Sequence, residues 1–188
     1  GAHSGQFFKW AREIWPEAFI WMLEANECHE SKLKNLATNN NAKYNIATIG
    51  DSEREVDFYT RSDKPHTEGA SYYKESAYWD IPQLVMNIPK TLQPLDALFV
   101  DNSKFDLIKI DTQGSELDII KGGLKLCKKA DYLLLEVSLV ELNEKAPIGD
   151  EVIRTVENYG FEKIFSIGEH YMGEKLIQQD IVFKNLNQ

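Results

Sequence analysis

The sequence contains little of several residue types, and each shortage excludes a class of protein. Only 2 of its 188 residues are cysteine, too few for a disulfide framework and typical of a cytoplasmic chain. No run of about 18 apolar residues occurs, so no membrane span is predicted. The 21 basic residues are outnumbered by 30 acidic ones, and the net charge of −9 leaves no basic face for nucleic acid.

Several catalytic motifs are also missing. Neither an H-E-x-x-H zinc motif nor the G-x-S-x-G turn of a serine hydrolase occurs, and no Gly-Lys-Ser/Thr phosphate loop is present. The histidines and cysteines show no close metal-ligand spacing and no C-x-x-C pair, so no metal site is predicted from them. These residues are His3, His29, His66, His170, Cys28 and Cys127.

What is present is an alternation of strands and helices. Apolar residues make up 43% of the chain, enough for one sizeable core. Apolar periodicity and turn residues predict helices over 6–15, 27–38, 95–99, 114–120, 124–129 and 149–158. They predict strands over 19–23, 44–49, 56–59, 105–110, 132–137, 161–167 and 180–184. This order indicates an α/β fold with helices on both faces of a parallel sheet, where ligands bind at the carboxyl ends of the strands.

Residues 61–87 form the least regular part of the sequence. The segment is polar and holds an aromatic cluster of Tyr72, Tyr73, Tyr78 and Trp79. A loop of this length within a compact domain is usually functional or mobile. Two interpretations stay open, namely a lid over a substrate and a loop anchored to the core by its aromatic residues.

Acidic residues follow three of the predicted strands. Glu24 follows the strand 19–23, where a carboxylate can accept both hydrogen bonds of a ribose diol; the alternative is a solvated loop acid. The turn Asp111-Thr-Gln-Gly-Ser-Glu116 offers a general base or orienting acid, although both acids also suit the start of a helix. Glu136, at the end of an apolar strand, is a third acid expected near the same edge of the sheet.

The segment 106–123 resembles the signature of FkbM-type methyltransferases, a branch of the class I S-adenosylmethionine-dependent enzymes. Its sequence DLIKIDTQGSELDIIKGG is similar to the family pattern K-I-D-x-[EQ]-G-x-E followed by an aliphatic pair and K-G. The chain's opening GAHSGQF is similar to the family's glycine loop G-A-N-x-G-x-[FY], and residues 23–26 resemble its [IV]-E-P-N segment. The resemblance covers nearly the whole chain.

The resemblance implies a single domain over residues 1–188, with 61–87 as a lid-like insertion. The implied fold is a Rossmann-like class I methyltransferase sheet, mostly parallel, with an antiparallel strand pair at its carboxyl end and helices on both faces. The implied cofactor is S-adenosyl-L-methionine, and the implied reaction is O-methylation of a small-molecule or glycan hydroxyl. Two alternatives remain, a non-catalytic binding module that keeps the fold and a nicotinamide-dependent oxidoreductase, which shares the ribose acid.

The resemblance also implies roles for individual residues. The glycine loop would approach the methionine part of the cofactor, and this loop is Gly1, Ala2, His3, Gly5 and Gln6. Glu24 would bind the ribose, Ala25 and Asn26 would lie beside the adenosine, and Asp51 and Ser52 would lie near the adenine. Asp111 and Gln113 would lie near the methyl donor. Asp111 is the first choice for a catalytic base and Glu116 the second.

The sequence departs from the family pattern in three places. His3 replaces the usual Asn, and Ala25 replaces the usual Pro. The family also has a central first strand directly before the glycine loop, and no such strand precedes Gly1, so the domain is expected to be truncated there. A missing central strand leaves two unpaired edges. We expect another segment to fill that space, or a second copy of the chain to pair with the edge as a homodimer.

Overall fold

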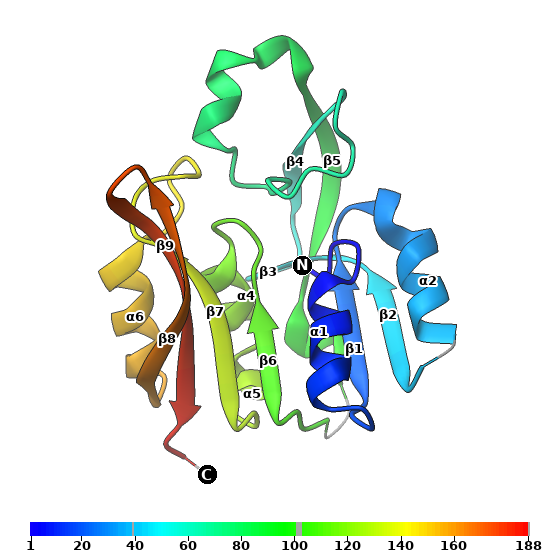
Figure 1. Cartoon of the computed structure of the whole chain (residues 1–188), viewed down its shortest axis with the longest axis vertical. Helices are drawn as coiled ribbons and strands as arrows, with labels where there is room; N and C mark the ends of the chain where they lie inside the picture. Colours follow the sequence, from blue (N-terminus) through cyan, green and yellow to red (C-terminus); the bar gives the residue numbers. More distant parts are fainter. Residues whose placement is uncertain (39, 101–102, 188) are drawn as a thin grey trace.

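The computed structural model describes residues 1–38, 40–100 and 103–187, and it shows a mixed α/β fold (Figure 1). Helix α1 lies in front of strand β1 in this view, whereas α4 and α5 lie behind β6 and β7. Strands β4 and β5 rise above the rest of the molecule. Helices therefore cover both faces, as expected. Within the described ranges, no helix has the length and apolar character needed to cross a bilayer.

The strands form three hydrogen-bonded sheets. Strand β1 (Ile20–Glu24) pairs in parallel with β2 (Ala42–Ile46). The second sheet has the order β3-β5-β4 and consists of β3 (Thr48–Gly50), β5 (Val85–Pro94) and β4 (Glu55–Arg61). The third has the order β6-β7-β9-β8 and consists of β6 (Leu107–Ile110), β7 (Tyr132–Ser138), β9 (Lys175–Asn185) and β8 (Phe161–Met172).

This topology corrects the expectation of one mostly parallel sheet. The pairs β1–β2, β3–β5 and β6–β7 are parallel, but β4–β5, β7–β9 and β8–β9 are antiparallel. The antiparallel pair at the carboxyl end is present, and its strands are longer than predicted. The fold is thus mixed rather than mostly parallel, because the long β5 and the β8–β9 hairpin add as many antiparallel pairs as parallel ones.

The helices are short and pack on the strands through two apolar clusters. They are α1 (Gln6–Ile14), α2 (Glu30–Thr38), α3 (Leu95–Leu98), α4 (Glu116–Gly122), α5 (Leu124–Cys127) and α6 (Gly149–Asn158), with 3-10 turns over Glu27–His29 (η1), Ser76–Asp80 (η2) and Pro82–Leu84 (η3). The larger cluster joins α4, α5 and α6 to β6, β7 and β9. The smaller one, around Phe8, Met22 and Leu33, joins α1 and α2 to β1.

A gap separates β1 from β6. Among the described strands, β1 pairs only with β2 on one side, and β6 pairs only with β7. Only Phe8 and Ala11 of α1 are buried, while Trp10 and Ile14 are 48% and 46% exposed beside the gap. Residues 1 and 2 link the two sides at one end, because the Ala2 N–H donates to Leu23 O over 2.8 Å and the amino group of Gly1 donates to Asp111 O.

We predict that Gly122→Ala destabilises the fold strongly. The added Cβ would lie 2.0 Å from the carbonyl oxygen of Gly50, so α4 would have to move away from β3. Overpacking of this kind costs about 1–3 kcal/mol of unfolding free energy, or about 2–4 °C in Tm for each kcal/mol. Thermal unfolding measures the change. The exposed Lys125→Ala on α5 is the control, and equal Tm values for the two variants would contradict the argument.

Candidate active site

A cleft of about 1330 Å³ opens between β1 and β6. One part of its wall is apolar and includes Phe7, Trp10 and Ile14 of α1. Another part is polar and is formed where β1, β6 and β7 end, with Glu24, Asp111 and Glu136 in the lining. The carboxyl ends of parallel strands are where α/β folds bind ligands. This end of the cleft is therefore the candidate site.

Glu24 is fixed by the backbone on both sides. One oxygen, Oε2, accepts the His3 N–H over 2.6 Å, and the other, Oε1, accepts the Asn26 N–H over 2.7 Å. The residue is 8% exposed and lines the cleft. Each carboxylate oxygen has a second acceptor position. Glu24 can therefore hold its orientation and still accept hydrogen bonds from two hydroxyls of a ligand.

The two glycines of the opening loop have different structural roles. A Cβ on Gly1 would lie 2.6 Å from Oε2 of Glu24, so only glycine lets the backbone pass this close to the carboxylate. Gly5 has a φ of +81°, and a Cβ there would lie 2.2 Å from Leu36 of α2. Gly1 thus shapes the cleft, whereas Gly5 allows the loop to turn into α1 against α2.

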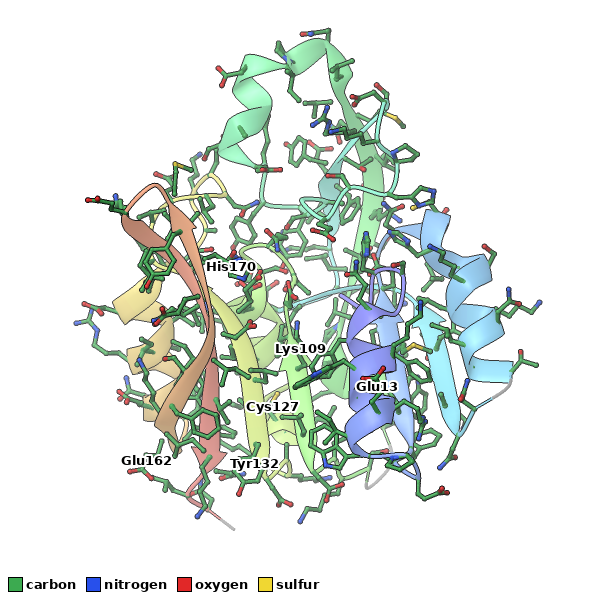
Figure 2. The ribbon with its side chains drawn as sticks, in the orientation of Figure 1. Glu13, Lys109, Cys127, Tyr132, Glu162 and His170 are labelled. Atoms are coloured by element: carbon green, nitrogen blue, oxygen red, sulfur yellow. The ribbon has the colours of Figure 1, made fainter. Side chains whose placement is uncertain are left out.

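A lysine, an amide and two acids meet at the ends of β6 and β7. Lys109 lies near the end of β6, and Asp111 follows that strand directly; the two side chains form an ion pair of 2.5 Å. The Nε2 of Gln113 donates to Glu136 over 2.8 Å and lies 3.4 Å from Asp111. Figure 2 shows Lys109 beside α1, where its Nζ lies 5.3 Å from the ring centre of Phe7.

The pKa values of the two acids in this group, Asp111 and Glu136, are shifted in opposite directions. Burial by itself would raise the pKa of Asp111, but nearby positive charge, including that of Lys109, outweighs burial and lowers that pKa. Burial and the negative charge of Asp111 raise the pKa of Glu136. Asp180, opposite Glu136 in the β7–β9 register, has its pKa raised as well. Near pH 7 the pair therefore carries one proton, held on Glu136, while Asp111 stays ionised.

Glu116 faces the turn rather than the cleft. Its carboxylate accepts the Thr112 N–H over 2.8 Å and the Gly114 N–H over 3.1 Å. It is 6% exposed, and burial raises its pKa. These contacts hold the 111–116 turn in shape, and Gln113, whose φ is +57°, is kept in this strained conformation within it.

The segment 62–84 between β4 and β5 is tied to α4. The hydroxyls of Tyr72 and Tyr73 both donate to Asp118 Oδ2, over 3.2 Å and 2.8 Å, and Asp118 is 7% exposed. Tyr72 also lines the cleft. The side chains of Tyr78 and Trp79 lie outside the described residues. Tyr72 and Tyr73 of the aromatic cluster thus anchor the segment to α4, and Tyr72 also forms part of the cleft wall.

The structure brings most of the predicted site residues to one cleft. The predicted residues that line it are Gly1, Ala2, His3, Gln6, Glu24, Ala25, Asp111 and Gln113. The others lie outside its lining, namely Gly5, Asn26, Asp51, Ser52 and Glu116. Asp51 is instead paired with Arg54 over 3.3 Å. Sequence reasoning missed Lys109. Its position near the end of a strand, two residues before Asp111, could have indicated that it pairs with that acid.

A family model described as "Methyltransferase FkbM domain" matches residues 1–163. The chain belongs to this family. The FkbM match runs from the glycine loop to the start of β8, so it includes Glu24, Asp111 and Glu136 but not β9 with Asp180. Searches of curated proteins and of solved structures gave no match.

We predict that Glu136 makes stability depend on pH. Its pKa lies above the ordinary value of 4.5, so above that pH the folded state binds more protons than the unfolded state. The unfolding free energy should therefore fall as pH rises from 5 to 8, by at most about 1.4 kcal/mol per pH unit from this group.

Denaturant unfolding at several pH values tests this dependence. Glu136→Gln keeps a hydrogen-bond acceptor for Gln113 and should flatten the dependence of the unfolding free energy on pH. Part of the dependence should remain, because the pKa of Asp180 is raised as well. The exposed Glu162→Gln, also labelled in Figure 2, is the matched control and should keep the native slope. An unchanged slope in Glu136→Gln would refute the assignment of the proton.

Proposed function

We propose that this protein is an S-adenosylmethionine-dependent methyltransferase that methylates a hydroxyl group of a small molecule or glycan. One observation carries the proposal. In a chain of the FkbM methyltransferase family, the Glu24 carboxylate and the Asp111–Glu136 pair line the same cleft from its two sides. We also propose that the sheets together represent a Rossmann-like class I arrangement.

The residues of the cleft fit such a cofactor. The polar end of the cleft, where Glu24, Asp111 and Glu136 lie, is the part that we assign to the cofactor and the acceptor. We assign the ribose hydroxyls to Glu24, whose oxygens keep free acceptor positions. We assign the methionine part to the backbone of Gly1 to His3, and the adenosine to the side of Ala25. Gly5, Asn26, Asp51 and Ser52 stay predictions as cofactor contacts.

The acids at the ends of β6 and β7 are suited to position and deprotonate an acceptor. When bound, the cofactor supplies a methyl group carried on a positively charged sulfur. Asp111, ionised beside Lys109, can accept the proton of an acceptor hydroxyl or hold it by a hydrogen bond. Because its pKa is lowered, Asp111 is a weak base, and positioning should account for most of the rate enhancement. Gln113 keeps Asp111 and Glu136 oriented.

We predict that Glu24→Gln weakens binding of S-adenosylhomocysteine by about 10- to 100-fold, since a hydrogen bond to a charged group contributes about 1.5–3 kcal/mol. Isothermal titration calorimetry measures the affinity. Glu157→Gln, an exposed acid on α6, is the matched control and should bind like the unmodified protein. Equal affinity in Glu24→Gln would remove the cofactor assignment, and so would the absence of binding both by the unmodified chain and by a chain with a strand added ahead of Gly1.

The same titration separates the alternative functions. Saturable binding of NADH in place of S-adenosylhomocysteine would favour an oxidoreductase. Binding of S-adenosylhomocysteine without methyl transfer to any hydroxyl acceptor would favour a binding module. Neither result depends on the identity of the natural acceptor.

We further propose that the gap between β1 and β6 accepts one more parallel strand, connected to Gly1. Two features support the proposal. Residues 1 and 2 already hydrogen-bond to Leu23 O and Asp111 O, the ends of the two facing strands. The apolar side chains Trp10 and Ile14 stand exposed where such a strand would cover them.

Adding a six-residue apolar strand ahead of Gly1 tests this arrangement. We expect a higher Tm and a blue shift of tryptophan fluorescence, because Trp10 and neighbouring rings become buried. A scrambled extension containing two prolines is the control, since proline cannot pair in a central strand. Light scattering should show a monomer for the extended chain. A dimer that forms only without the extension would instead support pairing of two copies.

A further inference from the structure

A second group of reactive side chains lies away from the acids of β6 and β7. Cys28 and His29 belong to η1, directly before α2, and His66 belongs to the segment 62–84. One ligand atom from each, the Cys28 Sγ and a ring nitrogen of each histidine, lies within 4.8 Å of the other two. The chain thus brings a thiol and two imidazoles together from distant parts of the sequence.

His29 is the clearest sign that this group is built for a ligand. The residue is 1% exposed, yet neither of its ring nitrogens has a hydrogen-bond partner among the described residues. Its ring lies 4.1 Å from that of His3 and 5.2 Å from that of His66, centre to centre. A buried polar atom without a partner is costly, and an ion is one of the groups that satisfies such atoms.

The backbone around the group is fixed by other contacts. The carbonyl of Pro65 accepts from Asn26 Nδ2 over 2.9 Å and from the Cys28 thiol over 3.1 Å. Asn26 Oδ1 in turn accepts the Cys28 N–H over 3.2 Å, which caps η1. These bonds join η1 to residues 65–66. The three side chains therefore face one another without a ligand to hold them.

We propose that Cys28, His29 and His66 form a zinc-binding site. One thiolate and two neutral imidazoles are ligands that zinc prefers, in a tetrahedral set whose fourth position is open to water. On binding, the Cys28 thiol gives its proton to water, and the resulting thiolate coordinates the ion.

Zinc bound at this site would affect the cleft through residues that are next to the ligands in the sequence. Thr67 and Glu68 follow His66 directly and line the cleft, and Asn26 beside Cys28 also donates its backbone N–H to Glu24. A zinc ion at this position would hold residues 65–68 against η1 and so fix one wall of the cleft. The inference concerns metal binding alone, so it stands or falls independently of methyl transfer.

Titration of the full chain with zinc chloride, after removal of metal by a chelator, tests the site. We expect one zinc per chain and a higher Tm when it is bound. Cys28→Ser and the exposed His66→Ala should each weaken binding by at least about tenfold, since even residues that only support metal ligands contribute 10- to 100-fold. His170→Ala is the matched control, an exposed histidine of the β8–β9 hairpin labelled in Figure 2.

Cobalt provides a second, spectroscopic measurement. With cobalt(II) in place of zinc, the unmodified protein should show a thiolate-to-metal charge-transfer band that Cys28→Ser lacks and His170→Ala keeps. Circular dichroism confirms that the variants are folded. Absence of saturable zinc binding, or equal affinity in Cys28→Ser, His66→Ala and the unmodified chain, overturns the proposal. Calorimetry with S-adenosylhomocysteine on the metal-free protein tests the proposed cofactor separately.

Discussion

The carboxylate of Glu24 is the contact on which the geometry of this end of the molecule depends. It accepts backbone N–H groups from His3 and Asn26, and it leaves room for no side chain on Gly1. Through these contacts one side chain sets the path of the opening loop and the start of η1. Because the opening loop and η1 both contact this buried acid at the end of β1, Glu24 shapes that end of the cleft.

A second constraint is the charge balance at the ends of β6 and β7. Asp111, Glu136 and Asp180 approach one another with Lys109 as the nearby basic side chain. Three ionised acids so close would repel each other, and this repulsion, together with burial, raises the pKa values of Glu136 and Asp180. The proton held on Glu136 is what makes the site sensitive to pH. The predicted pH dependence of stability and the proposed role of Asp111 thus rest on the same arrangement of acids.

The predictable parts of the fold are those with strong local patterns. Helix α6 has the predicted bounds, and β1, β6 and β7 lie within a residue or two of theirs. The predicted strand 44–49 instead divides at Ala47, whose N–H still donates to Glu24 O while Thr48 pairs with Leu92 in another sheet. Strand β5 was missed because Pro89 and its polar residues hide the alternation. A local pattern cannot show which sheet a residue joins.

The same distinction between local patterns and tertiary contacts applies to the functional residues. Glu24, Asp111 and Glu136 were singled out from sequence because each was expected at the carboxyl end of a strand, where α/β folds bind ligands. In the structure Glu136 lies two residues before the end of β7, and β1 belongs to a different sheet from β6 and β7. Cys28, His29 and His66 were not singled out, because their meeting depends on how the segment 62–84 folds back over η1. That segment contacts both regions, through Tyr72 and Tyr73 at Asp118 and through Pro65 and His66 at η1. Its two attachments flank the cleft, so a change at either one alters the same wall.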